Sequence, residues 1–141
     1  MPISVGDHIR KKRLQLGLFQ REAAQRLGVH PSTVLNWEKG RTEPPVSAVP
    51  AIFRFLSYNP YPPPESFPER LLAKRRETGL SISDAAELAG IDPGTWGRWE
   101  RGGTILYRQH RVRIAKILDM SLDALDKEFI ASRNQLHGRD P

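Results

Sequence analysis

The amino-acid sequence predicts an all-α protein with two small tandem domains joined by a proline-rich linker. Apolar residues recur at helical spacings along the 141 residues, and no segment alternates in the way that a β-strand does. A shift of 62 positions aligns residues 10–40 with residues 72–102 without a gap, and 12 of these 31 positions are identical. Between the copies, the stretch NPYPPPESFP carries five prolines, a composition typical of an extended spacer. We therefore expect a first domain over 1–58, a linker over 59–68, a second domain over 69–120 and a C-terminal helix and tail over 121–141.

Local signals place the helices of the first copy. Ser4, with Asp7 three residues later, predicts an N-terminal cap for the first helix. Gly28 predicts the end of the second helix, because glycine permits the positive φ of a turn that directly follows a helix. Pro31 predicts the start of the third helix, since proline suits the first helical position. The expected helices cover residues 5–16, 19–27, 31–40 and 46–56, the last divided in two at Pro50.

The second copy repeats this plan. Ser81 and Asp84 have the spacing of a capping box at the start of its second helix. Asp92, followed by Pro93, opens its third helix in the same way as the corresponding residues of the first copy. Two further amphipathic helices are expected over 106–118 and 120–133.

The second and third helices of the first copy, joined by a turn that begins at Gly28, form a helix-turn-helix. Val34 and Trp37 lie three residues apart on the third helix, so we expect both to face the core. The opposite face is small and polar, which suits the major groove of DNA: asparagine pairs with adenine, serine bonds to donors or acceptors, and leucine touches a thymine methyl. The residues expected at bases are Pro31, Ser32, Leu35 and Asn36, and Thr33 is expected to contact DNA beside them.

Other polar residues of the first copy are placed to meet the DNA backbone. Gln20 and Arg21 open the second helix, where free backbone N–H groups and the helix dipole favour a phosphate. Gly40 and Arg41 follow the third helix, where a basic loop would meet the backbone, and Lys39 continues the outward face of that helix. We therefore expect Gln20, Arg21 and Arg41 to contact phosphates and Lys39 to contact DNA from the helix face.

The first copy resembles the lambda-repressor-like (Cro/repressor, or xenobiotic-response-element type) helix-turn-helix family. The resemblance is carried by the order RxxxGLxQxExAxxLGVxxxTVxxWExG, and the stretches VGDHIRKKRLQLGL, VLNWEKGRTEP and FRFLSYNP resemble small bacterial regulators with this architecture. It covers residues 5–58 closely and residues 68–118 more loosely, and it does not cover residues 119–141. It implies that Gln20 contacts a phosphate and that the exposed face of the third helix reads bases.

The resemblance also implies a structural role for the most regular part of the repeat. Arg13 and Glu38 match a buried ion pair that braces the first helix against the third, and Arg75 and Glu100 repeat it. The recurrence of tryptophan and glutamate in both copies is therefore interpreted as support for the third helix and not as DNA recognition.

The second copy departs from the first at positions that matter for DNA. Ile82 stands where the first copy has Gln20, which removes an expected phosphate contact. Trp96 takes the inward position of Val34, a large substitution that demands local repacking. The exposed face of its third helix reads Pro93, Gly94, Gly97 and Arg98, and each glycine weakens the helix by about 1 kcal/mol relative to alanine.

These departures leave two interpretations of the second copy open. In one, Arg98 reads guanine or holds a phosphate with support from Arg101, and the chain is a built-in pseudo-dimer that reads two unlike half-sites. In the other, the second copy has become a dimerisation or scaffold domain. The expected contacts in the first interpretation are Gly94, Thr95, Arg98 and Arg101.

Composition narrows the class of partner. The net charge of +6 and the isoelectric point of about 10.1 indicate an anionic partner, of which nucleic acid is the commonest. The chain has no cysteine, and its four histidines lack the spacing of metal ligands, so we expect no metal and no cofactor. No signal peptide and no apolar run long enough to cross a membrane is present, which predicts a cytoplasmic protein, of bacterial type by the resemblance.

Two function classes remain after these exclusions. The first is a sequence-specific, DNA-binding transcriptional regulator of repressor type that reads double-stranded DNA through the first copy. The second is a protein-interaction or antitoxin-like module that uses the same fold without tight DNA binding. An enzyme is not expected, because no nucleophile with a matching base, no metal-ligand spacing and no phosphate-binding loop occurs. No separate ligand domain is evident, so no small-molecule effector is expected, and homodimerisation stays open.

Overall fold

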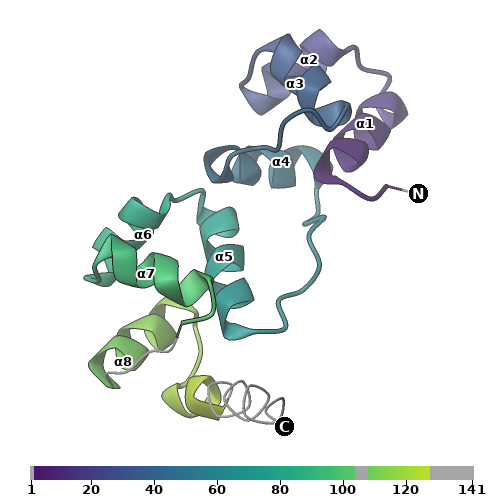
Figure 1. Cartoon of the computed structure of the whole chain (residues 1–141). Helices are drawn as coiled ribbons and strands as arrows, with labels where there is room; N and C mark the ends of the chain where they lie inside the picture. The colour runs from purple at the N-terminus through teal and green to yellow at the C-terminus, as the bar shows by residue number, and fades with distance from the viewer. Residues whose placement is uncertain (1, 104–107, 128–141) are drawn as a thin grey trace, which may run out of the picture. The chain divides into compact units, whose positions relative to one another are not determined.

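The computed structural model describes residues 2–103 and 108–127, and this part of the chain confirms the all-α prediction (Figure 1). These residues form helices and no β-strand. The chain divides into two compact units that separate between Pro62 and Pro63, with the short segment Arg76–Gly79 counted in the first unit. Apart from that segment, each unit holds one copy of the repeat.

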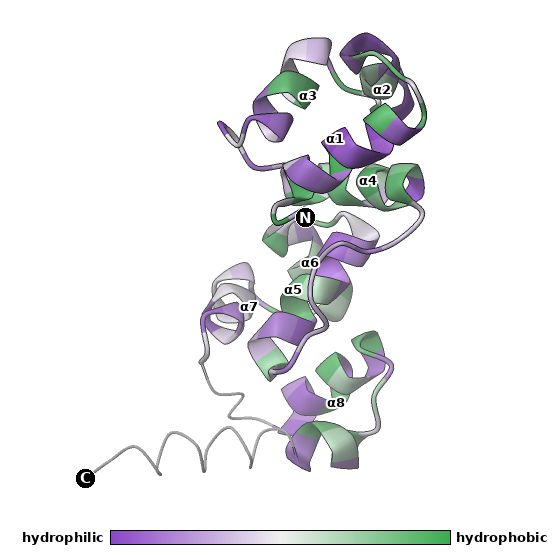
Figure 2. Cartoon of the chain, turned by 90° about the vertical axis from the view of Figure 1, so that its right-hand side faces the viewer, coloured by the Kyte–Doolittle hydropathy of each residue, from purple (hydrophilic) through white to green (hydrophobic). Residues whose placement is uncertain are grey.

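The first unit contains four α-helices and one short 3-10 helix: α1 (Val5–Gln15), α2 (Gln20–Leu27), α3 (Pro31–Glu38), η1 (Val46–Ala48) and α4 (Val49–Leu56). α3 packs against both α1 and α2, and α4 contacts the same two helices. The core takes Ile9, Ala24, Val34 and Ile52 from the four helices in turn, each 1% exposed or less. α4 is largely hydrophobic along its length (Figure 2); four of its residues are buried, and three of them, Ile52, Phe55 and Leu56, belong to this small core.

The helix ends in this unit follow from local hydrogen bonds. The capping box of α1 forms as predicted: the N–H of Asp7 donates to Ser4 Oγ at 3.1 Å, and the N–H of Ser4 donates to the Asp7 carboxylate at 3.1 Å. α2 begins one residue later than expected, with Phe19 as its cap position. The Phe19 side chain accepts no bond, and only the backbone N–H of Phe19 donates, to Glu22 at 2.9 Å. Gly28 ends α2 with a φ of 71°.

The second unit repeats the plan with α5 (Phe67–Thr78), α6 (Ile82–Ala89), α7 (Pro93–Glu100) and α8 (Arg108–Ile117). Its core takes Leu71, Ala86, Trp96 and Ile114 from these four helices, each 1% exposed or less. Leu125 joins them with no exposed surface, so the helical residues 122–127 pack as part of the same unit.

Some expected elements differ from the observed ones at their ends. α5 begins at Phe67, inside the segment expected to be linker, because the Phe67 side chain is only 2% exposed and belongs to the second core. α8 falls within the helix expected over 106–118, whose first two residues lie outside the described part. Of the helix expected over 120–133, residues 128–133 likewise lie outside it.

Candidate nucleic-acid interface

The candidate interface is built on α3, which is held by its inward face. Val34 and Trp37 are 0% and 4% exposed, and they fix the helix against the first core. With these two residues inward, the other side of α3 faces outward. Pro31 and Ser32 are exposed, and the other expected DNA contacts on this helix are half-buried: Thr33, Leu35 and Asn36.

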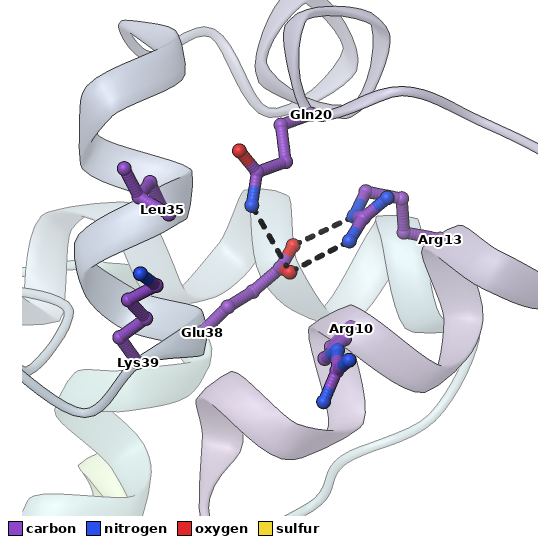
Figure 3. Close-up of a pocket in the computed structure, with 6 residues that line it drawn as sticks. All are labelled: Arg10, Arg13, Gln20, Leu35, Glu38 and Lys39. Carbon is purple, nitrogen blue, oxygen red and sulfur yellow. Dashed lines mark hydrogen bonds and ion pairs between the residues drawn. The ribbon is translucent and has the colours of Figure 1, made fainter.

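A buried ion pair ties α3 to α1. Arg13 Nε donates to Glu38 Oε2 at 2.8 Å and Arg13 Nη2 donates to Glu38 Oε1 at 2.9 Å, so the contact is bidentate (Figure 3). The third guanidinium nitrogen, Nη1, donates to the carbonyl oxygen of Leu18 at 3.0 Å. The Glu38 side chain is 3% exposed and that of Arg13 is 12% exposed. The hydrogen bonds to Glu38 raise the pKa of Arg13 above its ordinary value.

A pocket of about 260 Å³ opens beside this ion pair. Gln20 lies at its edge, and its side-chain amide donates to Glu38 Oε1 at 3.4 Å, while its oxygen points away from Glu38 (Figure 3). An amide nitrogen carries two donors, so this bond leaves one for another acceptor. The pocket is lined by residues from α1, α2 and the end of α3: Arg10, Arg13, Gln20, Leu35, Glu38 and Lys39.

The exposed cationic side chains of the first unit that make no ion pair within the described residues include Arg10, Arg21, Lys39 and Arg41. The Arg21 guanidinium lies 5.0 Å from the centre of the Phe19 ring, which leaves its N–H groups free for other acceptors. Arg10 was not among the expected contacts. Its position three residues before Arg13 on α1 is the signal that could have found it, because residues three apart share a helix face.

The N-terminus of α3 has an unusual cap. The backbone N–H of Ser32 donates to His30 Nδ1 at 3.1 Å, and the Ser32 hydroxyl lies 2.8 Å from the same nitrogen. The imidazole therefore orients the Ser32 side chain on the exposed end of the helix. The sequence indicated the start of this helix through Pro31 but did not indicate the histidine cap.

The second unit forms the equivalent ion pair with a different third donor. Arg75 Nε and Nη2 donate to Glu100 at 2.6 and 2.8 Å. Where the amide of Gln20 donates to the carboxylate in the first unit, the indole N–H of Trp96 donates to Glu100 in the second. Trp96, which stands at the position of Val34, thus supplies the hydrogen-bond donor that Ile82, at the position of Gln20, lacks.

The exposed face of α7 is shaped by a short chain of hydrogen bonds. The N–H of Thr95 donates to the Asp92 carboxylate at 3.2 Å, and Arg98 Nη2 donates to the Thr95 hydroxyl at 3.1 Å. Arg98 and Arg101 are both exposed. The expectation that Gly97 lies on the exposed face is wrong: Gly97 is buried, because the Arg101 guanidinium folds over it, with Nη1 3.3 Å from where a Cβ would stand.

Neither metal chemistry nor membrane insertion is indicated by the described residues. Among them, no three histidine or carboxylate side chains are grouped closely enough to hold a metal ion. None of their helices combines the length and the apolar character that spanning a bilayer requires.

Comparison with protein families assigns one domain to each copy. Residues 9–61 match the family model described as Helix-turn-helix, and residues 69–127 match the model described as Helix-turn-helix domain. Searches among curated proteins and among solved structures found no match. The two matches cover separate parts of the chain and coincide with the helices of the two units. The chain therefore belongs to the helix-turn-helix proteins and carries two tandem domains of the lambda-repressor-like type.

Proposed function

We propose that this protein is a sequence-specific DNA-binding transcriptional regulator of repressor type, acting in the bacterial cytoplasm and reading the major groove with α3. The observation that carries the proposal is the outward polar face of a firmly held helix, near cations that make no ion pair with any other described residue. The proposed activity is binding and involves no catalytic step or cofactor.

Base recognition is assigned to the outward residues of α3. Asn36 offers a donor and an acceptor in one planar amide, which matches the N6 and N7 edge of adenine. Ser32, oriented by His30, bonds to a donor or an acceptor, and Leu35 provides an apolar contact for a thymine methyl. Because Val34 and Trp37 anchor the opposite face, these side chains are presented at a fixed angle.

Backbone recognition is assigned to the pocket and its surroundings. Arg10 and Lys39 line the pocket with Gln20, whose second amide hydrogen is available to a phosphate oxygen. Arg21 directly follows Gln20 in the sequence, and Arg41 lies two residues after Lys39. Both are exposed, and we assign them to the same contact with the DNA backbone. Phosphate contacts of this kind set the position of the protein on the duplex and supply most of its salt-dependent affinity.

The protein-interaction alternative is favoured by one observation on the same domain. Leu14, Leu16 and Phe19 surround the turn between α1 and α2 and are 58%, 44% and 64% exposed. Closely spaced exposed apolar side chains often mark a protein contact. This surface is compatible with DNA binding by α3, since its residues lie outside the pocket and outside α3.

Selection of bound sites from a random pool of duplexes by the full-length protein tests the proposal. The wild type should enrich a defined motif, and Asn36→Ala should relax the preference at one position of it while keeping the rest. A motif that Asn36→Ala leaves unchanged would contradict the assignment of α3. Failure to enrich any site at low salt would contradict DNA recognition altogether and favour the interaction module. Repression is tested by a reporter whose promoter overlaps the enriched motif, with Asn36→Ala as the control.

A further inference from the structure

The exposed side of α7 presents two guanidinium groups beside one exposed glycine, Gly94, and one buried glycine, Gly97. Gly94 and Gly97 occupy the positions that Ser32 and Leu35 hold on α3, so α7 has no bulky side chain at either place. Arg101 covers Gly97, and Arg98 stands where Asn36 stands in the first domain. Arginine is thus the one long polar side chain type left on this face.

Arg98 is held in one direction before any ligand is present. Asp92 accepts the N–H of Thr95, and the hydroxyl of Thr95 accepts from Arg98 Nη2. This bond uses one of the five guanidinium N–H donors, which leaves four, including one of the two parallel N–H pairs, available for an acceptor. The Asp92 carboxylate also lies over Gly94, with one oxygen 2.9 Å from where a Cβ would stand. A larger residue at position 94 would therefore disturb the carboxylate that holds Thr95 and, through it, Arg98.

The surroundings of Arg98 disfavour a phosphate as its partner. Three cations of the first domain, Arg10, Arg21 and Arg41, are replaced by neutral residues at the equivalent positions of the second. In addition, a carboxylate caps α7 where His30 caps α3, which places negative charge at the exposed end of the helix. Arg101 keeps the positive charge of Lys39, but this face still has fewer cations than that of the first domain, so a neutral acceptor suits it better than an anion does. Those neutral residues of the second domain are Leu72, Ser83 and Gly103.

We infer that the second domain also reads DNA, and that Arg98 specifies a guanine in its half of the site through the O6 and N7 acceptors. The inference rests on the proposed function and adds a second, unlike half-site to it. Arginine in a planar, bidentate arrangement is the commonest reader of guanine in the major groove, whereas Asn36 matches adenine. The first domain then carries most backbone contacts, and the second contributes one base-specific contact.

The test compares site selection by full-length wild type, Arg98→Ala, Arg98→Lys and Lys116→Ala. Arg98→Lys keeps the charge but loses the planar fork, and Lys116→Ala removes an exposed charge from α8 of the same domain. We expect wild type and Lys116→Ala to enrich the same two-part motif. Both Arg98 variants should lose a guanine from the part that Asn36→Ala does not affect. Thermal melts should show that the variants are folded, since Arg98 is exposed.

Binding to defined duplexes completes the test. Replacing that guanine pair by an adenine pair should weaken wild-type binding by roughly 5- to 150-fold and leave Arg98→Ala binding almost unchanged. Replacing the guanine by 7-deazaguanine, which lacks only the N7 acceptor, should weaken wild type and not Arg98→Ala. If the Arg98 variants select the wild-type motif, or if Arg98→Lys retains the guanine, the inference is wrong while the first-domain function stands. No enrichment by wild type would overturn both.

Discussion

At the scale of single residues, the two domains use different side chains to complete the hydrogen bonding of a nearly buried glutamate. Each third helix ends in a nearly buried glutamate that receives a bidentate arginine and one further donor. That donor is the Gln20 amide in the first domain and the Trp96 indole in the second. A carboxylate removed from water needs such partners, because an unmet charge in the interior is costly. In the second domain, Trp96 thus compensates for the amide donor that is lost where isoleucine stands at position 82.

Glu38→Ala is expected to lower the free energy of unfolding by about 3 kcal/mol or more, because Arg13 would keep a largely buried charge without its partner. Urea denaturation followed by circular dichroism measures this loss. Glu43→Ala removes an exposed carboxylate from the same domain and is the matched control, with an expected change within about 0.5 kcal/mol. Equal stability of Glu38→Ala and wild type would contradict the structural role of the ion pair.

Trp96→Phe is expected to destabilise the second domain by more than Trp99→Phe does, by about 1–3 kcal/mol. Both substitutions shorten a buried tryptophan, at 1% and 3% exposure, but of these two side chains only Trp96 donates to Glu100 within the described residues. The difference in urea unfolding energies isolates the indole hydrogen bond. Equal losses in the two variants would mean that the bond contributes nothing beyond packing.

The sequence pattern predicted which residues face the core better than it predicted which partners the long side chains contact. The spacing of Val34 and Trp37 placed both in the core, since helical periodicity fixes which face a Cβ occupies. Periodicity does not state where a flexible side chain ends. For that reason the inward bond of Gln20, the burial of Gly97 under Arg101 and the donor role of Trp96 came only with the structure.

At the scale of the helix, the cap of α1 was predictable because it depends on residues three apart in the sequence. Ser4 and Asp7 bond to each other's backbone N–H groups as the pattern indicated. The bonds from the backbone N–H groups of Ser4 and Ile3 lower the pKa of Asp7 below its ordinary value of 3.8. The ends of α8 were less predictable, since no such pair marks them.

Asp7→Ala is expected to lower stability at neutral pH and to have no effect in strong acid. A carboxyl group whose pKa is depressed by folding stabilises the folded state above its unfolded-state pKa, and this contribution is lost as the pH falls below it. The difference in melting temperature between wild type and Asp7→Ala should therefore be constant from pH 7 to about 5. It should shrink as the pH falls through 3.8 towards the lower folded-state value. A difference that persists at pH 2 would contradict the cap.

At the scale of the whole molecule, the two parts of the chain that carry the repeat differ in net charge. Residues 1–58 carry nine basic and four acidic residues, a net charge of +5, whereas residues 59–118 carry ten and seven, a net charge of +3. The repeat itself predicted two domains of one fold, because twelve shared residues include the turns and the ion pair. It did not predict that residues 122–127 would bury Leu125 in the second core, since one short apolar helix fits a cap and a dimer contact equally well.

The logarithm of the DNA-binding constant is expected to fall with the logarithm of salt concentration at a slope of about −3.6 or steeper. Four cations around α3 account for roughly −0.9 each, and a second-domain contact would add to them. Lys39→Ala should make the slope shallower by about 0.9, because one phosphate contact is lost. Arg54→Ala, an exposed cation on α4 and outside the pocket, should leave the slope unchanged. Fluorescence anisotropy of a labelled duplex between 50 and 300 mM salt measures both, and a flat response would contradict phosphate binding.

The chain has three tryptophans, and all of them lie on the third helices, Trp37 on α3 and the other two on α7. Each is buried, at 4% exposure or less. Their ultraviolet emission therefore reports the cores in which these two helices are buried, Trp37 in the first domain and the other two in the second. In Trp37→Phe the signal comes from the second domain alone, and in Trp96→Phe/Trp99→Phe it comes from the first. The melting of one domain can thus be followed optically inside the intact chain, without cutting the chain or attaching a dye.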